Sequence, residues 1–173
     1  MGKASSKNIS EALRIAIFAA ILLVSYVVSG VPYTFFYAAS PDFLLVFTVC
    51  IAMFLPPLSS GIFAVFAGLL KDIACASLFG FHGLIYLLCA VTVSLLIAFL
   101  VRRTFINALI TNAGAVIAVK FFYYFIYNVL FEKGGRIALF TGSVIPSVLL
   151  SIIILPVYYF AFRYVNRKFG IED

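Results

Sequence analysis

The sequence predicts an all-α integral membrane protein, a single domain built as a bundle of six transmembrane helices. Hydrophobic residues make up 65% of the 173 residues and charged residues 10%, whereas soluble domains have about 45–50% and about 25%. Apolar stretches long enough to cross a bilayer recur along the chain. Because they do not alternate with period two, they indicate helices and not the strands of a membrane barrel.

Six apolar stretches, separated by polar residues, prolines or glycines, are the expected helices. They cover residues 11–29, 41–57, 60–77, 83–101, 105–131 and 138–163. A short polar tail that carries Lys3 and Lys7 precedes the first of them. We interpret this first helix as an uncleaved span and not as a signal peptide, because the remainder of the chain is itself a membrane domain.

Prolines set the limits of the second expected helix. Pro41 suits the first turn of a helix, and Pro56 and Pro57 end it. The link that follows is short, so the second and third helices are expected to be antiparallel neighbours. Asp42 falls in the first turn, where the helix dipole favours a carboxylate. We interpret Asp42 as a cap of this helix, with a binding role as the alternative.

The later helices are separated by a glycine-containing turn and by a charged loop. The turn holds Gly80 and His82 and precedes the fourth helix. Residues 132–136, with the sequence EKGGR, are expected to be an exposed loop between the fifth and sixth helices. Pro146 and Pro156 lie inside the sixth helix and are expected to kink it.

Two adjacent charged residues, Lys71 and Asp72, lie inside the third apolar stretch. A charged side chain at membrane depth costs about 2.5–3.5 kcal/mol on insertion scales, so it usually faces protein or water. Asp72 shares one helical stripe with small residues three or four positions apart, among them Gly68. Small residues let another helix approach closely in a membrane. The sequence therefore places Asp72 in a helix–helix interface.

We expect Asp72 to pair with Lys120 of the fifth helix, with Lys71 as a competing or additional partner. Both helices are expected to run in the same direction. The rise is about 16 Å from Gly61 to Asp72 and about 21 Å from Ile106 to Lys120, a difference that a flexible lysine stem can absorb. Lys71 cannot easily meet Asp72, because adjacent side chains diverge by about 100° around a helix.

Basic residues set the expected orientation in the membrane. Of the 12 basic residues, eight fall on the side of both termini, two fall on the other side, and two lie within the membrane. The eight are Lys3, Lys7, Arg14, Arg102, Arg103, Arg163, Arg167 and Lys168; the two are Lys133 and Arg136; the last two are Lys71 and Lys120. The positive-inside rule then places both termini in the cytoplasm. The net charge of +6 indicates attraction to the lipid bilayer and not to nucleic acid.

Residue types that carry catalysis are scarce in this chain. His82 is the single histidine, and we interpret it as a capping or interfacial group and not as a ligand. No Ser-His-Asp set, paired carboxylate, metal-ligand spacing or phosphate-binding glycine loop occurs in the sequence. Lys71, Asp72 and Lys120 are expected to neutralise one another, with a proton or ion relay as the alternative. The sequence therefore predicts no enzymatic activity and no cofactor.

The third helix and the turn after it also carry a family resemblance. Gly68, followed four residues later by Asp72, then by small residues and the Gly80-x-His82 turn, resembles the central region of the MreD family of bacterial rod shape-determining membrane proteins. Lys71 departs from the family pattern, in which an aliphatic residue is expected. Elsewhere, the opening of the second helix and the prolines of the last helix resemble the corresponding family segments.

The resemblance implies a non-enzymatic scaffold subunit of the cell-wall elongation complex in the bacterial cytoplasmic (inner) membrane. Such a subunit binds MreC and helps control cell shape and peptidoglycan synthesis. Through MreC it is expected to work with RodA, a class B penicillin-binding protein and the actin-like MreB filament.

A second family leaves an alternative open. The substrate-binding S components of energy-coupling-factor importers, which take up vitamins or metals, are also six-helix membrane subunits of this size. Their first helix carries an Ala-x-x-x-Ala motif that docks the coupling subunit, and Ala12, Ala16 and Ala20 fit that spacing. The order of the other motifs favours MreD. Since the two families resemble one another in fold, the fold by itself does not decide between the functions.

Overall fold

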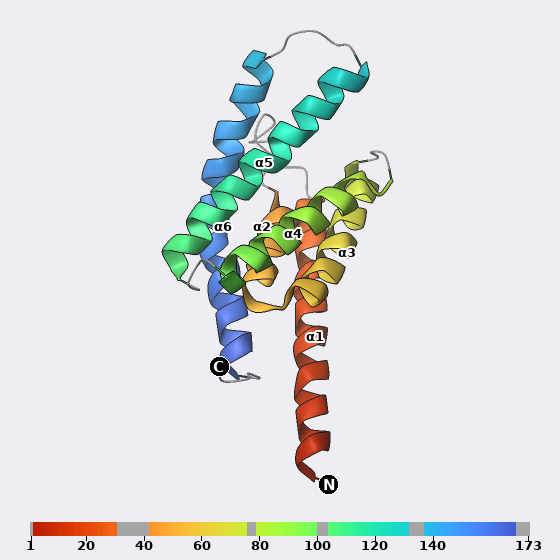
Figure 1. Cartoon of the computed structure of the whole chain (residues 1–173), viewed down its shortest axis with the longest axis vertical. Coiled ribbons are helices and arrows are strands. Elements are labelled where there is room, and N and C mark those ends of the chain that lie inside the picture. The colour runs from red at the N-terminus through yellow and green to blue at the C-terminus, as the bar shows by residue number, and fades with distance from the viewer. Residues whose placement is uncertain (1, 31–41, 76–78, 100–103, 132–136, 169–173) are drawn as a thin grey trace.

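The computed structural model describes residues 2–30, 42–75, 79–99, 104–131 and 137–168, and these residues form helices and no strand. The helices are α1 (Gly2–Ser29), α2 (Phe43–Phe54), α3 (Pro57–Cys75), α4 (Phe81–Phe99), α5 (Phe105–Phe131) and α6 (Ile137–Lys168). Both termini lie at the same end of the molecule, which we call the terminal end (Figure 1). The predicted all-α class is confirmed.

Two of the helices are longer than their apolar stretches predict. α1 begins at Gly2 instead of at residue 11, so the polar tail is helical, and α6 continues past residue 163 to Lys168. Polar residues can extend a helix beyond the apolar segment. The helix dipole favours basic residues in the last turn, here Arg167 and Lys168. The expected loop 132–136 and Pro41 lie outside the described residues.

Helix α2 is the centre of the fold. It contacts each of the other five helices, and ten of its 12 residues are buried. The buried residues are Leu44, Leu45, Val46, Phe47, Thr48, Val49, Cys50, Ile51, Ala52 and Met53. α2 rises only about 18 Å, against about 30 Å for the hydrocarbon core of a bilayer.

The prediction of six full-length spans is therefore supported for five helices. α1, α3, α4, α5 and α6 contain segments long and apolar enough to cross a membrane, whereas α2 is a shorter apolar helix. The apolar stretch 41–57 was expected to be a full span because a helix buried among other helices is as apolar as a helix that faces lipid. In addition, Pro57 begins α3 instead of ending α2, a position that proline favours.

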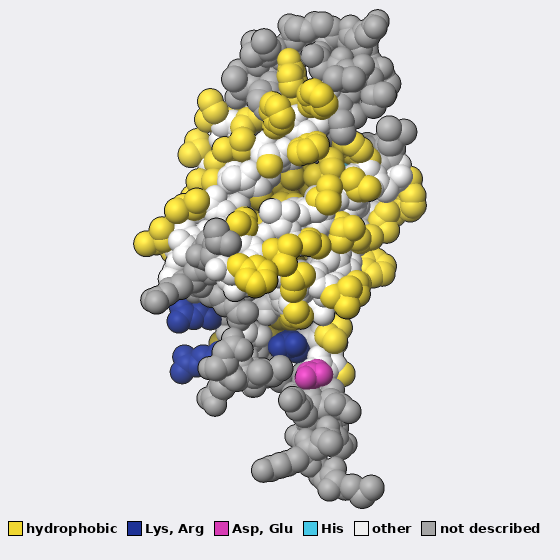
Figure 2. Space-filling model, viewed as in Figure 1, with side chains coloured by type: hydrophobic (Ala, Val, Ile, Leu, Met, Phe, Trp, Pro, Cys, Tyr) yellow, Lys and Arg dark blue, Asp and Glu magenta, His cyan; other side chains and the backbone are white. Residues whose placement is uncertain are grey.

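The outer surface of the bundle is apolar above its terminal end. Large side chains such as Phe66, Ile73 and Leu88 are more than half exposed, and Figure 2 shows such side chains spread over the visible face. The basic side chains visible in Figure 2 lie below this apolar region, near the terminal end. An apolar belt with charged residues at its margin is the distribution expected of a protein surrounded by lipid.

Candidate functional site: a buried charged network

Five polar or charged side chains meet where α3 ends and α4 begins, at the start of α2. They are Asp42, Lys71, Asp72, His82 and Tyr86. Asp42, Asp72, His82 and Tyr86 are buried, with 7%, 2%, 7% and 0% of their surfaces exposed. Charges in such surroundings persist only when paired and hydrogen-bonded.

Asp42 forms the first half of this network. Lys71 Nζ of α3 lies 3.1 Å from Asp42 Oδ1, and the Tyr86 hydroxyl of α4 donates to the same oxygen at 2.9 Å. One carboxylate oxygen therefore links the start of α2 to both neighbouring helices. A charged acceptor makes these bonds stronger than bonds between neutral groups.

Asp42 lies at the start of α2, as the expected capping role requires, and it also joins neighbouring helices. Asp42 stands at the N-cap position of α2, and its backbone carbonyl accepts from the N–H groups of Leu45 and Val46. Its carboxylate makes no capping hydrogen bond. Since Lys71 and Tyr86 approach from the adjacent helices, the carboxylate bonds to them instead.

Asp72 forms the second half of the network and caps helix α4 from α3. Its Oδ2 accepts from the backbone N–H of Gly80 at 2.8 Å, and its Oδ1 accepts from the backbone N–H of His82 at 3.2 Å. The first N–H groups of a helix have no partner within it, and its dipole favours a negative charge there. Asp72 Oδ1 also lies 2.7 Å from Nδ1 of His82. An ionised carboxylate only accepts, so Nδ1 carries the donated proton.

Glycines allow this arrangement at two positions. Gly80, whose carbonyl accepts from the N–H of Leu84 at the start of α4, has a φ of +90°, a conformation that other residues rarely adopt. At Gly68 the backbones of α3 and α4 touch, because a Cβ placed there would lie 2.4 Å from Gly83 Cα. The close approach brings Asp72, one turn further along α3, against the start of α4.

The two halves of the network are joined through α4. The His82 and Tyr86 rings lie edge to face, with centroids 6.1 Å apart and planes at 82°. On α3, the adjacent residues Lys71 and Asp72 diverge around the helix, so Lys71 reaches α2 while Asp72 reaches α4. Helix α3 thus ties together the start of α2 and the start of α4.

The sequence profile of the rod shape-determining protein MreD matches residues 8–169. The chain belongs to the MreD family. Membership assigns the chain to rod shape determination, and the matched region contains every residue of the network. Comparisons with curated proteins and with solved structures gave no match.

The expected ion pair between Asp72 and Lys120 does not fit the structure of this MreD family member. Asp72 is bonded to the start of α4, and among the described residues the backbones of α3 and α5 do not approach each other, whereas the backbone of α2 approaches both. Lys120 instead lies close enough to Asp42 and Lys71 to be influenced by both charges. The rise along two helices does not determine which helices are neighbours.

Within this MreD fold, the network is suited to holding helices together. The Asp72–His82 pair has the chemistry of two members of a catalytic triad, but Asp72 is also occupied by the backbone of α4, and the Tyr86 hydroxyl is donated to Asp42. Over the described part of the chain, no group of three or more His, Cys, Asp or Glu residues could hold a metal ion. The arrangement supplies hydrogen-bond donors to two buried carboxylates and links three helices.

Sequence reasoning placed Gly68, Asp72, Gly80 and His82 in one region, and the structure brings all four together. His82, which was expected in the turn before the fourth helix, is the second residue of α4 and is buried. Sequence reasoning missed Tyr86 altogether. Its signal was its spacing, since it follows His82 by four residues and therefore shares one face of the helix.

Proposed function

We propose that this MreD family protein is a non-enzymatic scaffold of the cell-wall elongation complex, in which it binds MreC and helps control peptidoglycan synthesis. The observation that carries the proposal is the family match over residues 8–169. Through MreC, the protein acts with RodA, a class B penicillin-binding protein and the MreB filament.

The buried network supports this proposal because its groups bond helices to one another. Asp42 and Asp72 each accept two or more hydrogen bonds from neighbouring helices, and both are buried. A scaffold needs helices held in one arrangement, so that the same surface is always presented to a partner. The charges therefore contribute rigidity and not turnover.

Co-purification with MreC tests the proposal. We expect the affinity-tagged chain, co-expressed with MreC from the same genome, to retain MreC in mild detergent at a fixed stoichiometry. An unrelated tagged membrane protein of similar size serves as the control and should retain none. A monodisperse, folded chain that retains no more MreC than this control would contradict the proposal.

The S-component alternative has one observation in its favour. Ala12, Ala16 and Ala20 are exposed on α1, so this small-residue stripe is free to contact another helix. The stripe suits docking to a coupling subunit and equally suits packing against the membrane helix of a scaffold partner. Tight, one-to-one binding of a vitamin or metal ion by the purified chain would favour the importer subunit over the scaffold.

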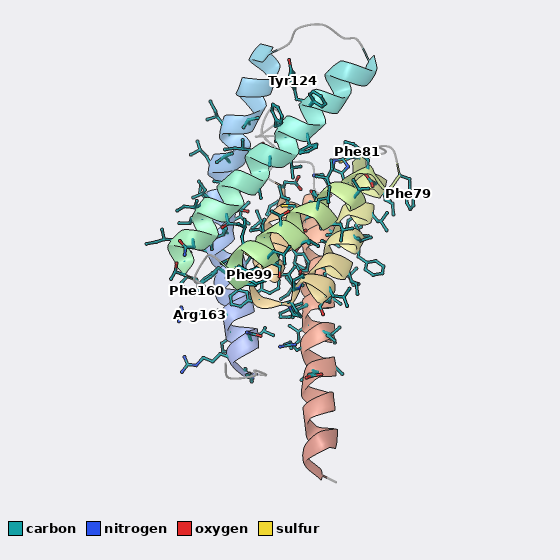
Figure 3. All side chains as sticks on the ribbon, in the orientation of Figure 1. Phe79, Phe81, Phe99, Tyr124, Phe160 and Arg163 are labelled. Atoms are coloured by element: carbon teal, nitrogen blue, oxygen red, sulfur yellow. The ribbon has the colours of Figure 1, made fainter. Side chains whose placement is uncertain are left out.

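The proposed orientation places the terminal end in the cytoplasm and the α3–α4 turn outside. Figure 3 shows Phe79 at this turn and Arg163 near the terminal end. In a variant without native cysteines, we expect Phe79→Cys in intact spheroplasts to react with a membrane-impermeant maleimide. Ser5→Cys and Arg163→Cys should react only after permeabilisation. Labelling of Ser5→Cys but not Phe79→Cys from outside would reverse the orientation.

A further inference from the structure

A pocket of about 400 Å³ lies at the terminal end of the bundle, remote from the charged network. It forms where α2 and α4 end and where α1 and α6 pass beside them. Its walls include Met53, Phe54, Pro57 and Ile97, and its polar groups include Arg14 of α1 and Asn166 of α6. A volume of this size is in the range of sites for small ligands, about 300–1,000 Å³.

Arg14 leaves a donor without a partner at this pocket. Its Nη1 donates to Asn166 Oδ1 at 3.4 Å, which is a long hydrogen bond, while its Nε is buried and makes none within the described residues. Among the described residues, no acidic side chain lines the pocket to neutralise the guanidinium charge. A buried donor on a charged group costs free energy unless an acceptor is bound, and an anion would supply that acceptor.

The surroundings indicate which anion fits. Asn166, which lines the pocket, is followed directly by Arg167 and Lys168 in the last turn of α6, and lipid headgroups are expected near such basic residues. Basic pockets between membrane helices on the cytoplasmic side bind acidic lipid headgroups. The planar guanidinium matches the oxygens of a phosphate, and the apolar wall suits a glycerol backbone and the start of an acyl chain.

We propose that this pocket binds the headgroup of an acidic phospholipid. Arg14 contacts the phosphate through Nε and Nη, and Phe54 and Ile97 cover the apolar part of the lipid next to it. The bound lipid then bridges α1, α2, α4 and α6 at the end opposite the charged network. This inference does not depend on the scaffold function, because it rests on the pocket and on the donors of Arg14.

Lipid binding by the purified full-length chain tests the proposal. We expect phosphatidylglycerol to raise the melting temperature of the detergent-solubilised protein by several degrees and to remain bound in native mass spectra. Phosphatidylcholine and inorganic phosphate should give less than a third of that shift, since the first lacks a net negative charge and the second lacks an apolar part. An equal shift with phosphatidylcholine would overturn the proposal. An equal shift with phosphate would reduce the pocket to a small-anion site and would also overturn it.

Variants locate the binding at this pocket. Arg14→Gln should weaken phosphatidylglycerol binding about tenfold, the loss expected for a charged hydrogen bond worth about 1.4 kcal/mol. Arg163→Gln, which removes an exposed cation at the same end but outside the pocket, should change it less than twofold. Ala98→Trp narrows the pocket from an exposed wall position and leaves Arg14 intact, so it should also block binding. Unchanged binding by both Arg14→Gln and Ala98→Trp would place the lipid elsewhere and refute the assignment.

Discussion

Among the glycines that the structure describes, Gly68 is the one whose replacement by alanine is expected to destabilise the protein most. The new Cβ would lie 2.4 Å from Gly83 Cα and 2.5 Å from both Gly83 N and the carbonyl carbon of His82. These are backbone atoms, which cannot rotate away as the end of a side chain can. The two helices must therefore move apart.

Separation of α3 and α4 also weakens the hydrogen bonds of Asp72. Overpacking of a core costs about 1–3 kcal/mol, and loosening a carboxylate that accepts from Gly80 and His82 adds to that cost. We expect Gly68→Ala to lower the melting temperature in detergent by at least about 8 °C, or to prevent accumulation of folded protein in the membrane.

Two glycine variants control for the loss of glycine as such. A Cβ at Gly83 would meet the Leu69 side chain at 3.5 Å and the Val65 carbonyl oxygen at 3.7 Å, which are ordinary contact distances, and a Cβ at Gly114 would meet nothing within 4 Å. Gly83→Ala and Gly114→Ala should therefore melt near or slightly above the unmodified protein, since alanine favours a helix over glycine by up to about 1 kcal/mol. If Gly68→Ala melts within one degree of Gly83→Ala, the backbone contact does not hold the two helices together.

The close approach at Gly68 was predictable in part, because small residues at helical spacing next to a charge indicate a helix interface. The sequence did not show which helix would fill that interface. The turn at Gly80 makes α4 the neighbour of α3, and the nearest available donors for Asp72 are then backbone N–H groups of α4. A search for oppositely charged side chains does not consider backbone N–H groups, so Lys120 was predicted as the partner of Asp72.

The central position of α2 was not predictable for a different reason. All of its 12 residues except Thr48 are apolar, as in a helix surrounded by lipid, and periodicity does not separate the two cases. Once α2 is placed in the middle, the partner of Lys71 follows. Asp42 stands at the start of α2, and α3 passes it within reach of a lysine side chain.

The second large effect is expected at the Asp42–Lys71 pair. Removing one partner of a buried pair leaves an uncompensated charge and costs about 3–5 kcal/mol. Asp42→Asn and Lys71→Met should each lower the melting temperature, and the double variant should recover part of the summed loss. A coupling free energy of about 0.5–3 kcal/mol is typical of contacting residues.

Lys120 makes the two single losses unequal. Asp42→Asn leaves the positive charges of both Lys71 and Lys120 without the nearby carboxylate, whereas Lys71→Met leaves Asp42 with the charge of Lys120 and the hydroxyl of Tyr86. We therefore expect Asp42→Asn to be the more damaging change. Tyr86→Phe, which removes one neutral donor to the Asp42 carboxylate, should be milder, at about 1.5–3 kcal/mol.

A matched cycle separates this pair from the one that the sequence suggested. Asp72→Asn and Lys120→Met alter residues on helices whose backbones do not approach each other within the described chain, so their losses should add to within about 0.5 kcal/mol. Additive losses for Asp42 and Lys71, together with coupling between Asp72 and Lys120, would show that α2 does not separate α3 from α5. The bundle would then have to be assembled with α5 against α3, and the central place of α2 would be lost.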